Sequence, residues 1–133
     1  MTSKTPYYKA FDALKNIYLE DSWVLEIHDI EKSISFEMEF VLTKSHKFYD
    51  KPKKGEQYCY KRGQLILSGC AAKTLHLSDA EPSIDANGEK DLGNIYLFVK
   101  QNEQVELEGE WGRVIAKCDE VLVRYSPVSS KKA

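Results

Sequence analysis

The chain has 133 residues, of which 42% are hydrophobic, 11% aromatic and 30% charged, with a formal net charge of −2. This length fits one domain with a core of its own, and the composition excludes a disordered chain, which would be poor in aromatic residues and strongly charged. The near-neutral balance also excludes a global field that would attract nucleic acid or an anionic membrane.

A helix is predicted at the start of the chain. The hydroxyl of Thr5 can cap it, and Pro6 fits its first position, where a missing N–H costs nothing. Its apolar face is formed by residues at spacings of four, three and four: Tyr7, Phe11, Leu14 and Tyr18. Because so short a helix is marginal in water, we expect this face to close one end of a β core rather than to bind a partner.

After Glu20-Asp21-Ser22 the hydrophobic period changes to two, which predicts strands. The strongest alternation covers 33–43. A strand at 23–27 and a connection at 28–32 would form a hairpin with it. Further strands are predicted at 57–61, 64–70, 73–77, 94–100, 104–109, 113–118 and 121–125. Residues that tolerate tight bends mark turns at Arg62-Gly63, Asn87-Gly88, Gln101-Asn102 and Trp111-Gly112.

These segments predict a mainly β protein, α+β by count: an antiparallel β-sandwich or partly closed barrel with one N-terminal amphipathic helix. Residues 95–99 are apolar on both faces, as in a central strand covered on each side, whereas 104–110 alternates and has one face in water. We expect a single domain over 1–126 and a disordered tail over 127–133.

The three cysteines, Cys59, Cys70 and Cys118, are far apart and include no C-x-x-C pair. This spacing indicates neither a disulfide framework nor a zinc knuckle, so we expect small buried hydrophobic residues in a reducing compartment. No apolar run approaches the roughly 20 residues that cross a bilayer, and the polar N-terminus lacks the apolar stretch of a secretion signal. These features predict a cytoplasmic protein with no membrane partner.

Charge is unevenly distributed along the sequence. Residues 44–63 carry a net charge of +5 and four aromatic side chains, which could bind a single-stranded nucleic acid. The favoured interpretation is a solvated loop whose aromatic residues anchor it to the core. Residues 79–91 carry a net charge of −4. Counted from Asp85, a calcium loop needs glycine at its sixth position and glutamate at its twelfth, where this chain has Lys90 and Tyr96. With the glutamates of 103–110 they form an acidic surface that could meet a basic partner such as a nuclease.

Sequence motifs for nucleophilic, metal-dependent or nucleotide chemistry are absent. The three histidines, His28, His46 and His76, lie in separate segments, and no cofactor or metal is assigned. Glu26 and His28 project from one face of a strand and could form an acid–base pair, a geometry that any wet strand face also provides. The sequence therefore does not favour an enzyme.

Three stretches, 17–27 (IYLEDSWVLEI), 40–46 (FVLTKSH) and 55–60 (GEQYCY), resemble a family of small uncharacterised bacterial proteins. Some such families resemble the immunity proteins that accompany secreted toxins, and the resemblance implies a protein that blocks a partner's surface. The candidate binding surface comprises Tyr18, Asp21, Trp23, His46, Tyr49, Glu56, Tyr58 and Tyr60. Each of these side chains could equally serve core packing or loop anchoring.

The function predicted from these features is a non-enzymatic binding domain with a protein partner, in its most concrete form a toxin-neutralising, immunity-like protein. One alternative is a β-barrel ligand-binding protein or enzyme with a pocket around His46, Glu56, Tyr58 and Tyr60. The other is a weak single-stranded nucleic-acid binder that uses 44–63, which the acidic balance of the whole chain does not favour. The sequence leaves the oligomeric state open.

Overall fold

The computed structural model describes residues 4–46, 48–49, 51, 54, 59–78, 83–84 and 90–126. The elements in chain order are β1 (Thr5–Pro6), α1 (Tyr7–Ala10), a 3-10 turn η1 (Asp12–Leu14), β2 (Ile17–Ile30), β3 (Ser33–Leu42), β4 (Cys59–Ser68), β5 (Ala72–Leu77), β6 (Ser83–Ile84), β7 (Lys90–Asp91), β8 (Ile95–Gln101), β9 (Gln104–Gly109), β10 (Gly112–Lys117) and β11 (Glu120–Tyr125).

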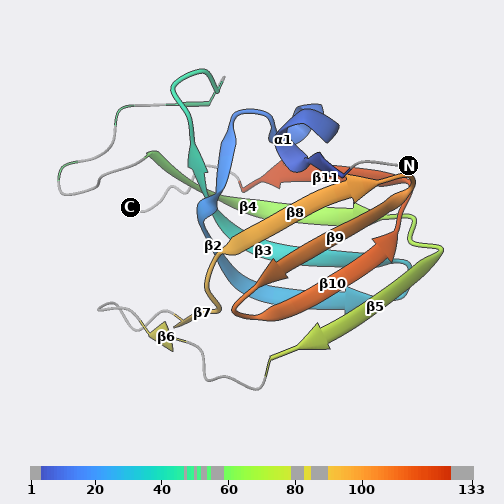
Figure 1. Cartoon of the computed structure of the whole chain (residues 1–133). Helices are drawn as coiled ribbons and strands as arrows, with labels where there is room; N and C mark the ends of the chain where they lie inside the picture. Colours follow the sequence, from blue (N-terminus) through green and yellow to red (C-terminus); the bar gives the residue numbers. More distant parts are fainter. Residues whose placement is uncertain are drawn as a thin grey trace.

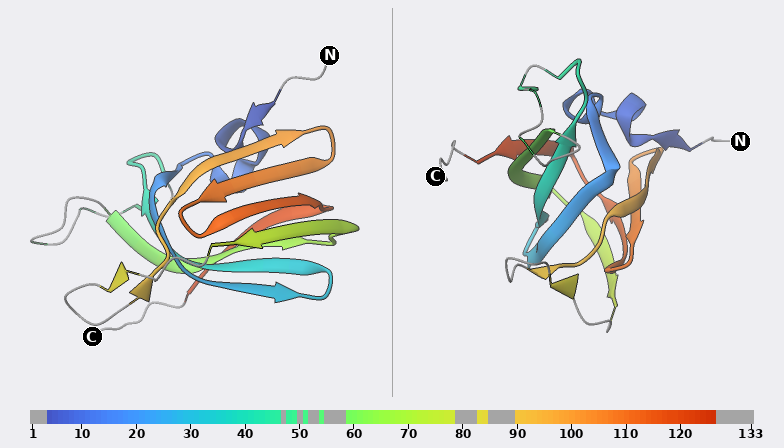
Figure 2. Two further views of the ribbon diagram at one scale, coloured as in Figure 1. Left: turned by 60° about the horizontal axis from the view of Figure 1, so that its bottom comes forward. Right: turned by 90° about the vertical axis from the view of Figure 1, so that its left-hand side faces the viewer.

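Two antiparallel sheets form a β-sandwich, which confirms the predicted fold class (Figure 1). Sheet A has the strand order β1-β8-β9-β10-β5, sheet B has the order β11-β4-β3-β2, and β6 and β7 form a separate small ribbon. Figure 2 shows the two main sheets as separate layers, with α1 and η1 at one end of the sandwich. The core lies between the layers.

The core is built by the alternation that predicted the strands. Along β3, one side chain in two is buried and belongs to a single apolar cluster: Ile34, Phe36, Met38, Phe40 and Leu42. Leu65 and Leu67 of β4 join this cluster, and sheet A contributes Leu107 and Val114 from the opposite layer. Each such side chain removed from water stabilises the fold by about 1.5–3 kcal/mol.

The helix is shorter than predicted. It spans Tyr7–Ala10 and ends where Phe11 adopts an extended conformation, with φ −132° and ψ 118°. Thr5 does not cap it, because Thr5–Pro6 is the edge strand β1, paired with β8. Tyr7 and Phe11 pack on Phe98 of β8, with ring centroids 5.9 and 5.7 Å apart, and close one end of the core as expected. Tyr18 does not belong to this face, because it lies in β2 and is 51% exposed.

The predicted turn at Arg62-Gly63 is wrong, since β4 runs unbroken from Cys59 to Ser68. Gly63 is there for close packing: a Cβ at this position would lie 2.4 Å from the carbonyl oxygen of Arg124 on β11. The turns predicted at residues 101–102 and 111–112 are confirmed, with positive φ values of 58° at Asn102 and 133° at Gly112. Asn87-Gly88 lies outside the described residues.

Two further strand predictions need adjustment. The first hairpin turns at residues 31–32, because β2 continues to Ile30 and includes His28. The apolar strand β8 is not covered on both sides along its length, since the side chain of Tyr96 is 56% exposed. The predicted tail, 127–133, lies outside the described residues. Among the residues that are described, no helix is long and apolar enough to cross a membrane.

Candidate functional site

Strand β2 contains a large irregularity in its pairing with β3. Tyr18 pairs with Val41 and Trp23 pairs with Glu39, so four residues of β2, 19–22, oppose the single residue Phe40 of β3. Such bulges bend a strand, increase its twist and redirect side chains, and they are frequent beside functional sites. We call the exposed side chains of this irregularity, Tyr18, Asp21 and Trp23, the bulge surface.

A buried serine holds the irregularity in place. The Oγ of Ser22 donates a hydrogen bond to the carbonyl oxygen of Tyr18 at 2.6 Å and accepts one from the backbone N–H of Val41 at 2.9 Å. The side chain thus satisfies two backbone groups that the interrupted ladder leaves without strand partners, and Ser22 is fully buried. Because Ser22 points inward, its neighbour Asp21 points into solvent.

The other side of the irregularity is fixed to the segment that precedes β8. The backbone of Val24 bonds to Gly93 and Leu92 at 2.8 and 2.7 Å, and the side-chain amide of Asn94 donates to the carbonyl oxygen of Glu20 at 2.5 Å. β2 is therefore bonded to β3 on one side and, at the irregularity, to the chain that enters sheet A on the other. This double attachment makes the bulge surface part of a rigid corner.

Tyr7 adds a third attachment. Its hydroxyl accepts a hydrogen bond from the backbone N–H of Leu19 at 3.1 Å and donates to a carboxylate oxygen of Glu20 at 2.7 Å. Burial, followed by the hydrogen bond to Glu20, raises the pKa of Tyr7, so the phenol stays protonated and continues to donate.

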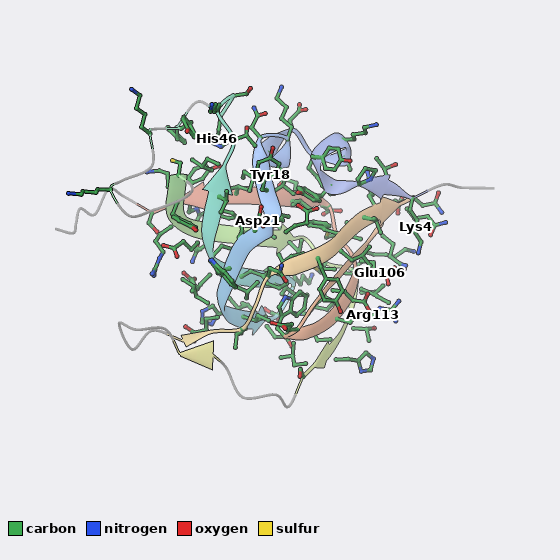
Figure 3. All side chains as sticks on the ribbon, turned by 60° about the vertical axis from the view of Figure 1, so that its left-hand side comes forward. Lys4, Tyr18, Asp21, His46, Glu106 and Arg113 are labelled. Atoms are coloured by element: carbon green, nitrogen blue, oxygen red, sulfur yellow. The ribbon has the colours of Figure 1, made fainter. Side chains whose placement is uncertain are left out.

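The bulge surface contains two exposed aromatic residues and one exposed carboxylate. Tyr18 is 51% exposed and Trp23 is 40% exposed, and Asp21 between them is also exposed. Figure 3 shows Tyr18 and Asp21 on β2. Within the described part of the chain, Asp21 makes neither a hydrogen bond nor an ion pair. Aromatic faces attract cations and a carboxylate binds them, so this arrangement suits a guanidinium or ammonium group.

Tyr60 extends the apolar part of the same side of sheet B. Tyr18 pairs with Val41 and Val41 pairs with Tyr60, so the three side chains form a row across β2, β3 and β4 on the side away from the core. Val41 is buried although it lies outside the main core cluster. In the next row Trp23 stands beside Glu39, whose carboxylate lies 3.4 Å from the Nε of Arg62.

The structure separates His46 from Tyr60, two residues of the predicted pocket. The Nε2 of His46 lies 2.6 Å from the hydroxyl of Tyr125, and the ring of Tyr125 packs against the core residue Phe40 at a centroid distance of 5.9 Å. His46 therefore adjoins the core side of sheet B, whereas Tyr60 faces the opposite side. Tyr49 is half-buried against the core. Glu56 and Tyr58 lie outside the described residues, as do 47, 50, 52, 53, 55 and 57 of the basic segment 44–63.

The bond between His46 and Tyr125 has a defined direction. The backbone N–H of Phe48 donates to the Nδ1 of His46 at 3.0 Å, so a neutral imidazole carries its proton on Nε2 and donates it to the Tyr125 hydroxyl. Burial raises the pKa of Tyr125 to about 12. This cluster anchors the start of the segment that follows β3.

The charged groups on the two outer faces are largely paired with one another. On sheet A, Glu106 contacts both Lys4 and Arg113 (Figure 3), and the Nε of Arg113 lies 3.8 Å from Glu108. On sheet B, Glu26 and His28 share one face as predicted, 3.9 Å apart, and Glu37 is 3.8 Å from the same histidine nitrogen. The acidic character expected for 103–110 is therefore partly neutralised. No group of three or more metal-binding side chains gathers within the described ranges.

Sequence reasoning identified the exposed residues of the bulge surface but missed the residue that positions them. The triplet Glu20-Asp21-Ser22 interrupts the hydrophobic pattern and predicts a break before the first strand, whereas in the structure it forms the irregularity inside the long strand β2. Tyr125, the partner of His46, was also missed, because only the register of β11 with β4 brings it to that end of the sheet.

Comparison of the chain with protein-family models, with curated protein sequences and with solved structures finds no match.

Proposed function

We propose that this chain is a non-catalytic protein-binding domain that docks its partner through the bulge surface. The observation that carries the proposal is the exposure of Tyr18, Asp21 and Trp23 within one irregularity of β2, which Ser22, Asn94 and the backbone of Val24 attach to the neighbouring segments. Aromatic anchors on a pre-organised backbone are the usual centre of a protein interface, because they bury a large area with little loss of conformational entropy.

The partner surface that fits best is basic and contains arginine. A guanidinium can stack on the Trp23 or Tyr18 ring while it forms hydrogen bonds with the Asp21 carboxylate. Asp21 is available for this role because no side chain of the described residues pairs with it. The carboxylate of Glu39, the β3 residue that pairs with Trp23, is already paired with Arg62, so specificity at this point rests on Asp21.

An immunity-like role in the bacterial cytoplasm is the most concrete form of this proposal. All three residues of the bulge surface fall within 17–27, one of the stretches on which the resemblance to bacterial immunity-like families rests. A basic toxin such as a nuclease offers the arginine-bearing surface that the bulge surface would bind. Blocking such a partner needs complementarity and no reactive group.

The indole N–H signals of the two tryptophans test the proposal by NMR. The full chain is titrated with a short peptide of alternating glycine and arginine, and with a glycine–glutamate peptide as the matched control. We expect the Trp23 signal to shift in a saturable way with the arginine peptide only. Trp111 is an internal reference, because it is buried and its N–H donates to the carbonyl oxygen of Asn94 at 2.9 Å.

Three variants separate the bulge surface from exposed aromatic residues in general. Asp21→Asn keeps the shape and removes the charge, so we expect the dissociation constant for the arginine peptide to rise about threefold to tenfold. Tyr18→Ala should weaken binding similarly, whereas Tyr96→Ala, which removes an equally exposed ring from β8, should leave it unchanged. Equal shifts with both peptides, or equal effects of Tyr18→Ala and Tyr96→Ala, would exclude the bulge surface as the binding site.

A further inference from the structure

Two cysteines meet at the corner where the chain passes between the sheets. Cys70 lies in the link from β4 of sheet B to β5 of sheet A, and Cys118 lies in the link from β10 of sheet A back to β11 of sheet B. The two links run antiparallel, the Sγ of Cys70 donates a hydrogen bond to the carbonyl oxygen of Leu67 at 3.6 Å, and each thiol contributes to the pKa shift of the other. Forty-seven residues separate them in the sequence.

Backbone hydrogen bonds fix the relative position of the two cysteines. The N–H of Ala71 donates to the carbonyl oxygen of Lys117 at 2.8 Å, and the N–H of Asp119 donates to the carbonyl oxygens of Ser68 at 3.0 Å and Gly69 at 3.2 Å. These bonds hold the two links side by side at Cys70 and Cys118. In a regular antiparallel pair, residues flanked in this way have Cα atoms about 4.5 Å apart, which is within the range of about 4.4–6.8 Å found for disulfides.

We propose that Cys70 and Cys118 are a redox-active pair that closes to a disulfide when the protein meets a low-molecular-weight disulfide such as oxidised glutathione. Cys118, the more exposed of the two, attacks one glutathione sulfur as a thiolate and releases the first glutathione. Cys70 then attacks the Cys118 sulfur of the mixed disulfide and releases the second. The two thiol protons end on the two glutathione thiols, and the two electrons reduce one glutathione disulfide.

The surroundings of the pair set its reactivity. Burial raises the pKa of both thiols, that of Cys118 to about 11, so little thiolate is present at neutral pH and exchange is slow. The charged groups that act on the pair are Lys73 and Lys100, which favour the thiolates, and Asp29 and Asp119, which oppose them. Slow closure suits a response to sustained oxidation rather than rapid turnover.

Closure would join the two links and therefore both sheets. In the unfolded chain the same bond closes a long loop, which removes conformational entropy from the unfolded state. We expect the midpoint of thermal unfolding to rise by about 10 °C on oxidation and to return when the disulfide is reduced.

Peptide mapping of the oxidised full-length chain tests the pairing. The chain is incubated with oxidised glutathione, its remaining thiols are alkylated, and it is digested with trypsin. Cys70 is then in the peptide 63–73, Cys118 in the peptide 118–124 and Cys59 in the peptide 55–61. We expect 63–73 linked to 118–124, and 55–61 alkylated. A link that includes 55–61, or glutathione adducts on Cys70 and Cys118 without a link between them, would overturn the proposal.

Serine variants extend the test. Cys59 begins β4 and lies nine residues from the end of this strand, roughly 30 Å along an extended chain, so it is too far away to pair with Cys70. The variant Cys59→Ser should therefore form the disulfide and gain thermal stability as the natural chain does. Cys118→Ser should gain none. If Cys118→Ser does not fold, the peptide map of the natural chain still decides between closure and its absence.

Discussion

In β2, the hydroxyl of Ser22 provides the hydrogen bonds that two backbone groups would otherwise make. Its hydroxyl bonds both Tyr18 and Val41, which lie on different strands, and it leaves neither group unsatisfied inside the protein. A small side chain with one donor and acceptor oxygen is what this position requires, and the exposure of Asp21 follows from it. At this scale the candidate site depends on a residue that makes no contact with solvent.

Ser22→Ala should lower the free energy of unfolding by about 1–3 kcal/mol, because it leaves the N–H of Val41 buried without its partner. Urea denaturation measures the change. Ser35→Ala is the matched control: Ser35 is also buried, but its hydroxyl forms no hydrogen bond within the described residues, so we expect a change below about 0.5 kcal/mol. Equal costs for the two variants would contradict the role given to Ser22.

Tyr125 makes stability depend on pH at the alkaline end. Burial raises its pKa from 10.0 to about 12, so the folded protein retains a proton that the unfolded chain releases. The contribution of Tyr125 is therefore complete below about pH 10 and is lost as the pH rises towards 12. Cys118, with a pKa raised from 9.0 to about 11, acts in the same direction from about pH 9.

The free energy of unfolding should accordingly fall between about pH 9 and about pH 12, as measured by urea denaturation at several pH values. Tyr125→Phe, which lacks the titrating group, should show a shallower fall than the natural chain above about pH 10. An equally steep fall in both proteins would show that Tyr125 does not cause it.

At the scale of elements, the strands were predictable wherever one side chain in two faces the core. β3, β9, β10 and β11 lie close to their predicted bounds because alternation and burial agree there, and β5 does so although none of its side chains is fully buried. The sequence was misleading where one residue serves a distant neighbour. Gly63 is predicted to be a turn residue from its type alone, whereas the close approach of β11 is what requires a glycine there. Tyr18 continues the helical spacing of the preceding residues, but the hydrogen bonds of Tyr7 to Leu19 and of Ser22 to Tyr18 hold this segment in a strand.

Gly63→Ala should destabilise the protein by about 2 kcal/mol or more, because the added Cβ would lie 2.4 Å from the carbonyl oxygen of Arg124 and 3.0 Å from the Cα of Tyr125. In urea denaturation, the exposed position Thr74 on β5 provides the comparison, where substitution by alanine should cost less than about 0.5 kcal/mol. If Gly63→Ala costs no more stability than Thr74→Ala, the result would contradict the close contact between β4 and β11 at Gly63.

Lys73 connects β5 of sheet A to the first hairpin of sheet B. Its Nζ lies 2.5 Å from a carboxylate oxygen of Asp29, 2.8 Å from the carbonyl oxygen of Ile30 and 3.1 Å from that of Ser33. The side chain is 16% exposed, so these charge-assisted bonds are less screened by water than a surface pair.

Lys73→Met keeps the aliphatic stem and removes the three hydrogen bonds. We expect faster amide hydrogen exchange at residues 29–33 and little change elsewhere in sheet B. Lys117→Met, on the exposed side of the neighbouring strand β10, should leave exchange in the hairpin unchanged. Unchanged protection of 29–33 in Lys73→Met would show that the lysine does not hold the hairpin.

At the scale of the whole molecule, the contacts between segments that are distant in the sequence could not be predicted. The attachment of β2 to residues 92–94 and the approach of the Cys70 and Cys118 links follow from how the two sheets are connected, and the contact of His46 with Tyr125 follows from the strand order within sheet B. Period-two patterns specify which side of a strand is buried, but they do not specify which strands become neighbours. The identities of exposed candidates could therefore be predicted, whereas their groupings could not.

The central claim is that the bulge surface, rather than another charged region, meets a basic partner. The competing region is the acidic side of sheet A, where Glu106 and Glu108 face Arg113. Because those carboxylates are already paired while Asp21 is not, the two regions should respond differently to an added guanidinium group.

Mapping all backbone amide shifts of the full chain during titration with the arginine–glycine peptide distinguishes them most directly. We predict that the largest shifts fall at residues 18–24 and at the facing residues 39–41 of β3, and that they decrease as salt concentration rises. Shifts centred on residues 104–117 of sheet A, or scattered over the surface without a maximum at β2, would contradict the proposed interface.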